Sequence, residues 1–125
     1  MKAAVFTYYA PFAEHLSVFT EAAQKIHDTA VAIADGGIRV IYNVALAEDA
    51  YIFDSRDGIT LQASAVQGLM YALSTAIHAV EGCAEGFQCE KAYIEDHPDK
   101  EYRGVMVDVA RCWHPVKQIL RFIDL

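Results

Sequence analysis

Cysteine and histidine are the residue types in this chain that could support the widest range of chemistry. Thiolate and imidazole groups are the usual ligands of zinc, and a thiol beside an imidazole base can act as a nucleophile. The candidates are His97, Cys112 and His114, with Cys83 or Cys89. Their spacings match no zinc finger or zinc ribbon, and spacing cannot show whether a thiol and an imidazole meet in space. We therefore predict neither a metal site nor a cofactor.

The cysteines also bear on the compartment in which the chain works. They are three in number and form no Cys-x-x-Cys motif, which favours free thiols in a reducing environment. A single Cys83–Cys89 disulfide is the alternative. The first residues do not form the apolar core of a signal peptide, because Tyr8, Tyr9 and Pro11 interrupt it. We expect a cytoplasmic protein, or an exported one whose leader has been removed.

Charge and composition exclude several classes of partner. The formal net charge is −7 and the ten Lys and Arg are scattered singly, so no basic stripe could follow a nucleic-acid backbone. No run approaches the roughly 20 apolar residues of a membrane span. Asp35-Gly36-Gly37 follows a predicted helix rather than a strand, the reverse of a phosphate-binding loop. The 125 residues suffice for one complete domain and a partial second one.

Hydrophobic periodicity predicts an α+β domain over residues 1–95. The β-prone runs are residues 3–8, 38–44, 50–54, 59–63 and 87–95, and the helical patterns are residues 12–33 and 66–80. Asp57-Gly58 favours a tight hairpin turn between the third and fourth runs. Ser64 and Gln67 form a capping-box pattern at the start of the second helix. We expect an antiparallel sheet with two helices packed on one face, and a loop over residues 82–86.

The composition changes at residues 96–100, where polar residues and Pro98 predict a linker. Residues 102–109 then form an apolar run that predicts a strand, and Pro115 opens a helix that continues to Leu125. The apolar side chains of this helix have no predicted partner; they are Val116, Ile119, Leu120 and Ile123. We place the domain boundary between residues 95 and 96.

The segment Asp96–Arg111 resembles the entry to the catalytic barrel of glycoside hydrolase family 20. Members of that family carry an Asp-x-Pro turn, then Tyr/Phe-Arg-Gly, then an apolar strand that ends in Asp-x-x-Arg. The corresponding motifs in this chain, in the same order, are Asp96–Pro98, Tyr102–Gly104 and Asp108–Arg111. Upstream, Gly68–Thr75 is similar to a helix of the small domain that precedes the barrel. The resemblance covers residues 38–125 by motif.

This resemblance implies a fold and an activity. Residues 1–95 would be the small domain, and residues 96–125 a linker with the first strand and helix of a truncated TIM barrel. The family are β-N-acetylhexosaminidases, which remove terminal β-linked GlcNAc or GalNAc with retention, and the 2-acetamido oxygen of the substrate is the nucleophile. Arg111 is implied in substrate binding, because a guanidinium can donate to two neighbouring hydroxyls. A surface arginine paired with Asp108 is the alternative.

The acid–base residues of that family have no counterpart in this chain. Their adjacent Asp-Glu pair lies on a later barrel strand, whereas Glu48-Asp49 and Glu95-Asp96 run in the opposite order and are interpreted as solvated charge. We therefore expect no catalytic residue here and no turnover by this chain alone. The implied partner is an N-acetylhexosamine-containing glycan bound by a longer parent, with no nucleic acid and no membrane.

Two further expectations remain open from the sequence. The unpartnered barrel segment of one chain could pair with a second copy to form a homodimer. The alternative function is a free-standing α+β module that binds a carbohydrate or a protein and has no catalytic activity.

Overall fold

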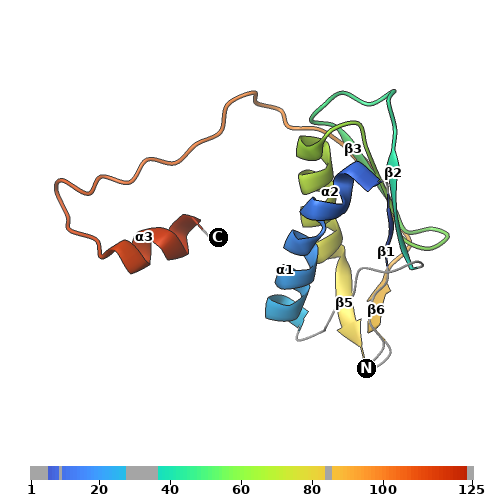
Figure 1. Cartoon of the computed structure of the whole chain (residues 1–125), viewed down its shortest axis with the longest axis horizontal. Helices are drawn as coiled ribbons and strands as arrows, with labels where there is room; N and C mark the ends of the chain where they lie inside the picture. Colours follow the sequence, from blue (N-terminus) through green and yellow to red (C-terminus); the bar gives the residue numbers. More distant parts are fainter. Residues whose placement is uncertain (1–5, 9, 28–36, 84–85, 124–125) are drawn as a thin grey trace.

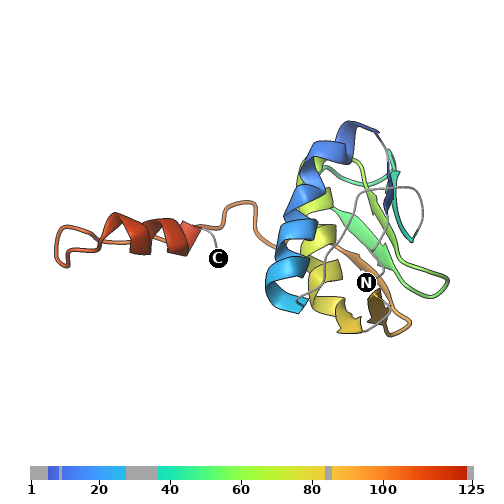
Figure 2. The same cartoon turned by 60° about the horizontal axis from the view of Figure 1, so that its bottom comes forward.

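A mixed five-stranded sheet forms one layer of the body, and two helices cover one of its faces (Figures 1 and 2). The computed structural model describes residues 6–8, 10–27, 37–83 and 86–123. The sheet strands are β1 (Phe6–Tyr8), β2 (Ile38–Tyr42), β3 (Tyr51–Asp54), β4 (Thr60–Ala63) and β7 (Tyr93–Asp96). Their spatial order is β1-β2-β4-β3-β7. The α+β class is confirmed.

The expected antiparallel pairing is correct for only half of this sheet. β3 pairs antiparallel with β4 and with β7, whereas β2 pairs parallel with both β1 and β4. Parallel neighbours need a crossover connection, and the chain supplies one between β1 and β2 that contains a helix. Outside the β3–β4 hairpin, the sequence pattern indicated the strands but not which of them would be neighbours.

The predicted hairpin is confirmed. β3 and β4 are joined through Asp57-Gly58 and pair from Tyr51 opposite Ala63 to Asp54 opposite Thr60. Gly58 has a φ of 77°, a backbone conformation that costs glycine nothing and other residues more. The turn therefore depends on the residue type that the sequence places there.

The helices begin differently from the prediction. Residues Ala10–His15 form a 3-10 helix, α1 follows as Ser17–His27, and α2 spans Val66–Ala79; the predicted extension of the first helix to residue 33 lies outside the described residues. The capping box at Ser64 is wrong. Ala65 is the N-cap of α2 and makes no side-chain cap bond, while the Ser64 hydroxyl donates to the carbonyl of Ala47 at 2.9 Å.

The hydrophobic core lies between the two helices and the sheet. Its fully buried large side chains are Leu16 and Phe19 before and within α1, Phe53 and Leu61 in the sheet, and Leu69 and Leu73 in α2. These positions recur at helical spacing in the helices, as the sequence predicted. Burial of this shared apolar face is what holds the two layers together.

The predicted loop over residues 82–86 is wrong for residues 82, 83 and 86, which belong to a second, two-stranded sheet; residues 84 and 85 lie outside the described residues. β5 (Val80–Cys83) pairs antiparallel with β6 (Gly86–Cys89), and Val80 lies opposite Cys89. The predicted single strand over residues 87–95 is thus divided between β6 and β7. Cys89 has a free thiol, so the alternative of a Cys83–Cys89 disulfide is wrong.

The segment after β7 extends away from the body (Figure 1). Residues 97–115, all of them described, form neither helix nor strand, so the predicted strand at 102–109 is wrong. A lone strand has no neighbour to satisfy its backbone groups. The helix expected after Pro115 is confirmed as α3 (Val116–Ile123), and Val116, Leu120 and Ile123 are exposed. Pairing of two copies through this face stays a prediction.

None of the helices in the described ranges combines the length and the hydropathy that crossing a lipid bilayer requires.

Candidate functional site

Arg111, the predicted substrate ligand, lies in the exposed segment after the body. Its side chain is 91% exposed, and its Nε lies 3.3 Å from a carboxylate oxygen of Asp108. The other Asp108 oxygen accepts the backbone N–H groups of Ala110 and Arg111. The structure therefore shows the Asp108 pairing that was the alternative interpretation. A role of Arg111 in sugar binding stays a prediction.

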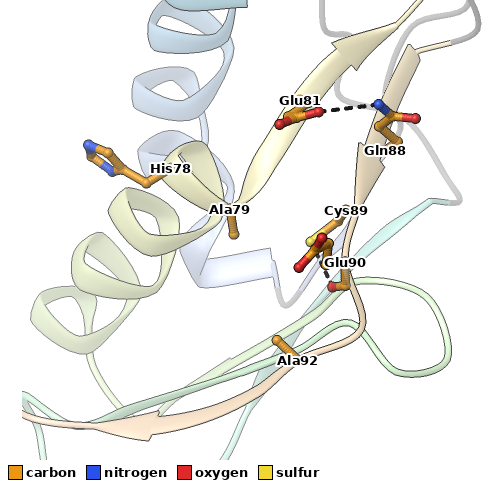
Figure 3. A pocket seen from close by; sticks show the side chains of 7 residues that line it. All are labelled: His78, Ala79, Glu81, Gln88, Cys89, Glu90 and Ala92. Atoms are coloured by element: carbon orange, nitrogen blue, oxygen red, sulfur yellow. Dashed lines mark hydrogen bonds between the residues drawn. The ribbon is translucent and has the colours of Figure 1, made fainter.

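A cavity of about 580 Å³ lies between the end of α2 and the β5–β6 hairpin (Figure 3). Its lining residues are His78, Ala79, Glu81, Gln88, Cys89, Glu90 and Ala92. Across the hairpin the Gln88 amide donates to Glu81 at 3.3 Å, and the half-buried Cys89 thiol donates to the Glu90 carbonyl at 3.3 Å. These contacts are structural, because each connects neighbouring parts of one hairpin.

The sequence left open whether a thiol and an imidazole base meet in space, and the same view answers this for Cys89 and His78. Figure 3 shows the His78 ring pointing away from Cys89, and its Nδ1 lies 2.7 Å from the carbonyl of Ser74. The imidazole is thus not placed to take a proton from the thiol. Among the described residues, no group of three or more His, Cys, Asp or Glu is placed to hold a metal ion.

A smaller polar cavity, of about 180 Å³, lies where the chain leaves β7. We call its lining the joint cluster: Tyr51, Tyr71, Ser74, Thr75, Asp96, His97, Pro98 and Arg103. The buried Tyr51 hydroxyl lies 2.6 Å from the Thr75 hydroxyl and donates to Asp96 at 3.2 Å. Burial raises the pKa of Tyr51, the Thr75 hydrogen bond opposes this, and Asp96 raises the pKa further. Tyr51 therefore stays protonated and connects β3, α2 and β7.

A second set of contacts in the joint cluster surrounds Tyr71. The Arg103 guanidinium lies over the Tyr71 ring, with its carbon 4.9 Å from the ring centroid, and one of its nitrogens donates to the Tyr71 hydroxyl. The Gln67 amide donates to the same hydroxyl at 3.0 Å. These contacts of Tyr71 with Arg103 and Gln67 were not predicted from the sequence. The available signal was the spacing of Gln67 and Tyr71, four residues apart on one helix face.

An ion pair at the β3–β4 turn lowers the pKa of one carboxylate, that of Asp54. Hydrogen bonds from the Arg56 side chain and backbone lower the pKa of Asp54 from 3.8 to about 2, and Nη2 of Arg56 lies 2.8 Å from Asp54. The Arg56 guanidinium also lies 4.5 Å from the centroid of the Tyr93 ring. Through Tyr93, the Asp54–Arg56 pair connects the hairpin to β7, and we interpret it as structural.

This pair predicts an acid-dependent change in stability. Because folding lowers the pKa of Asp54, its stabilising contribution is complete above the ordinary value of 3.8 and is lost as the pH falls toward about 2. The free energy of unfolding of Asp54→Asn should therefore be lower than that of the parent chain near neutral pH and converge with it in acid, as measured by urea titration. Asp57→Asn is the control in the same turn. A difference that is independent of pH would contradict the assignment.

The comparisons with known proteins agree on one family, although no family model matches the chain. A β-hexosaminidase of Vibrio furnissii is 34% identical over 83 residues, which is 66% of this chain and 14% of that protein. The structure of an exo-β-N-acetylglucosaminidase of family 20 from Vibrio harveyi, in complex with N-acetylglucosamine, matches 98% of this chain with a TM-score of 0.86 and 27% identity. This chain covers 20% of that structure.

A more distant structure shows the same fold. The family 20 β-N-acetylhexosaminidase of Streptomyces coelicolor matches 98% of this chain with a TM-score of 0.76, and the chain covers 27% of it. The identity is 21%, so this likeness concerns the fold alone. This chain spans a minor part of the length of each relative. Sequence and fold together relate it to the β-N-acetylhexosaminidases of glycoside hydrolase family 20, whose N-terminal domain its α+β body matches.

Proposed function

We propose that this chain is the small, non-catalytic domain of a β-N-acetylhexosaminidase together with the entry to its catalytic barrel. In the whole protein it would support the hydrolysis of terminal β-linked GlcNAc or GalNAc. The observation that carries this proposal is the match to the Vibrio harveyi structure over 98% of the chain. That match extends over residues after the body as well, which favours a glycosidase part over a free-standing binding module.

The chemistry of the described side chains supports a non-catalytic role for the body. Protonation of the leaving oxygen needs a carboxylic acid beside the scissile bond, and the sequence has no adjacent Asp-Glu pair. Asp96 is hydrogen-bonded to Tyr51, and Glu48 is exposed on a loop. We propose that this chain alone has no turnover and that the acid–base residues lie in the remainder of the parent.

Arg111 is the residue of this chain that we assign to the substrate. The guanidinium presents a rigid fork of donors that suits two adjacent sugar hydroxyls. Asp108, three residues earlier, accepts from the Arg111 Nε and would hold the other nitrogens toward a ligand. The sugar's own acetamido oxygen would act as nucleophile in the retaining mechanism of this family.

A chimera tests this assignment. The matching fifth of the Vibrio harveyi enzyme is replaced by this chain, and hydrolysis of a chromogenic N-acetyl-β-glucosaminide is measured. We expect an active chimera and an inactive isolated chain. Arg111→Ala should lower kcat/KM of the chimera by roughly ten- to a hundredfold, the loss of one or two charged hydrogen bonds.

Arg121→Ala is the matched control, because it removes an exposed arginine from α3 and should leave kcat/KM within about twofold. A chimera that melts cooperatively but hydrolyses nothing would contradict the proposed function. If the chimera is active and Arg111→Ala leaves its kcat/KM unchanged, Arg111 does not bind the substrate, whereas the proposed glycosidase function still holds.

A further inference from the structure

The joint cluster fastens the chain to the α2 side of the body at two points, one at the end of β7 and one after it. At the first point the Tyr51 hydroxyl contacts both Asp96, the last residue of β7, and Thr75 in α2. At the second point Arg103 lies on the Tyr71 ring and donates to its hydroxyl. The residues between these points, which looked like a linker from their composition, are therefore held at both ends.

The two points lie on the same part of α2. Tyr71 and Thr75 are four residues apart in the helix, so their side chains occupy one face one turn apart. His97 and Pro98 line the same cavity, and proline has a fixed φ that stiffens the backbone. The segment from Asp96 to Arg103 is thus held at both of its ends beside a single turn of α2, so the two contacts together limit how freely it can swing.

The contact with Tyr71 at the second point suits an arginine better than a lysine. The planar guanidinium can stack on an aromatic ring and donate from its edge at once, which the ammonium of lysine cannot do. The Tyr71 hydroxyl accepts from Gln67 as well as from Arg103, so both groups restrict where this hydroxyl can lie. Between residues 99 and 111, a range described in full, Arg103 is the residue whose side chain makes a hydrogen bond and a cation–π contact with the body.

We infer that residues 97–103 form a fixed joint and that Arg103 is a positioning residue, which sets the direction in which the chain continues toward Arg111. The joint itself rests only on the contacts of the joint cluster. Its importance for sugar binding rests on the proposed function, because Arg111 must then enter the substrate site at a defined angle to the small domain.

Limited trypsin digestion of the whole chain tests the joint without any sugar. Trypsin needs a mobile segment and a free basic side chain, so cleavage reports local opening. Arg103 is engaged by Tyr71, whereas Arg111 is 91% exposed in the same segment. We expect cleavage after Arg103 to be roughly tenfold slower than after Arg111, as local protection by one strong contact predicts.

Two variants at position 71 separate the contacts. Tyr71→Ala removes the ring and the hydroxyl, and should raise cleavage after Arg103 to nearly the rate after Arg111. Tyr71→Phe retains the ring and removes only the hydroxyl, and should give an intermediate rate. Cleavage after Arg111 should stay constant in both, and cleavage after Arg56, in the sheet hairpin, reports any general unfolding.

Equal cleavage after Arg103 and Arg111 in the unsubstituted chain would overturn the inference. The inference would also be overturned if neither Tyr71→Phe nor Tyr71→Ala increased cleavage after Arg103. In both variants, resistance at Arg56 shows that the hairpin is still folded. As a spectroscopic check, the Arg103 Nε–H resonance should be shifted by the ring and should lose this shift in Tyr71→Ala. An inactive chimera with a protected Arg103 would contradict the proposed function but not the joint.

Discussion

Replacement of Phe53 by alanine is expected to lower the free energy of unfolding by roughly 3–5 kcal/mol, the usual cost of emptying a buried aromatic site. Phe53 is 0% exposed and lies in β3, which has β4 on one side and β7 on the other. Its ring faces the core shared with both helices, so few groups could move to fill the cavity. Small domains have only about 5–15 kcal/mol in total, so a large part of the stability would be lost.

Urea titration followed by circular dichroism measures this effect. The matched control is Phe122→Ala, the same chemical change in α3, where the side chain is 46% exposed. That substitution should change the free energy of unfolding by about 0.5 kcal/mol or less. Equal effects at the two positions would show that the tail shares the core of the body.

The second large effect is expected at Gly68, in the first turn of α2. A Cβ at this position would lie 2.3 Å from the backbone oxygen of Ala50, and the Gly68 N–H donates to the Glu48 carbonyl at 3.0 Å. The loop before β3 therefore lies directly on the helix. Gly68→Ala should destabilise the chain by roughly 1–3 kcal/mol, as overpacking does, even though alanine is the better helix former by about 1 kcal/mol.

Gly58→Ala separates this steric effect from glycine's backbone freedom. Gly58 has a φ of +77° and no atom within 4 Å of an added Cβ, so its substitution costs only the left-handed conformation, roughly 1–2 kcal/mol. Thermal melts of both variants give the comparison. In Gly68→Ala the amide exchange of the loop at residues 48–50 should also increase, whereas a stabilised Gly68→Ala chain would show that the loop moves away freely.

Local patterns in the sequence predicted the local structure well. The Asp57-Gly58 turn and the apolar spacing of α2 depend on neighbouring residues, and both appear as expected. The Ser64 cap failed because a loop carbonyl, that of Ala47, takes the serine hydroxyl instead. A capping box can be read from four residues, but a competing acceptor 17 residues away cannot.

Longer-range features could not be predicted from periodicity. The spacing of apolar residues in β2 and β4 does not indicate that these two strands pair in parallel. The strands β5 and β6 contain glycines, which are typical of a loop. The contact of Arg103 with Tyr71 spans 32 residues. In contrast, the motifs between Asp96 and Arg111 predicted the likeness to glycoside hydrolase family 20, which the comparisons confirmed, because a motif carries information about distant structure that spacing lacks.

The position of β7 in the sheet has a consequence for how the chain is made. β7 pairs with β3 from Tyr93 opposite Asp54 to Asp96 opposite Tyr51, so the outer edge of the early hairpin stays open until residue 96 has been synthesised. Hairpins form within microseconds, whereas a ribosome adds only about 5–20 residues per second. For seconds, therefore, an unpaired β-strand edge is exposed on the nascent chain, where it can pair with another chain.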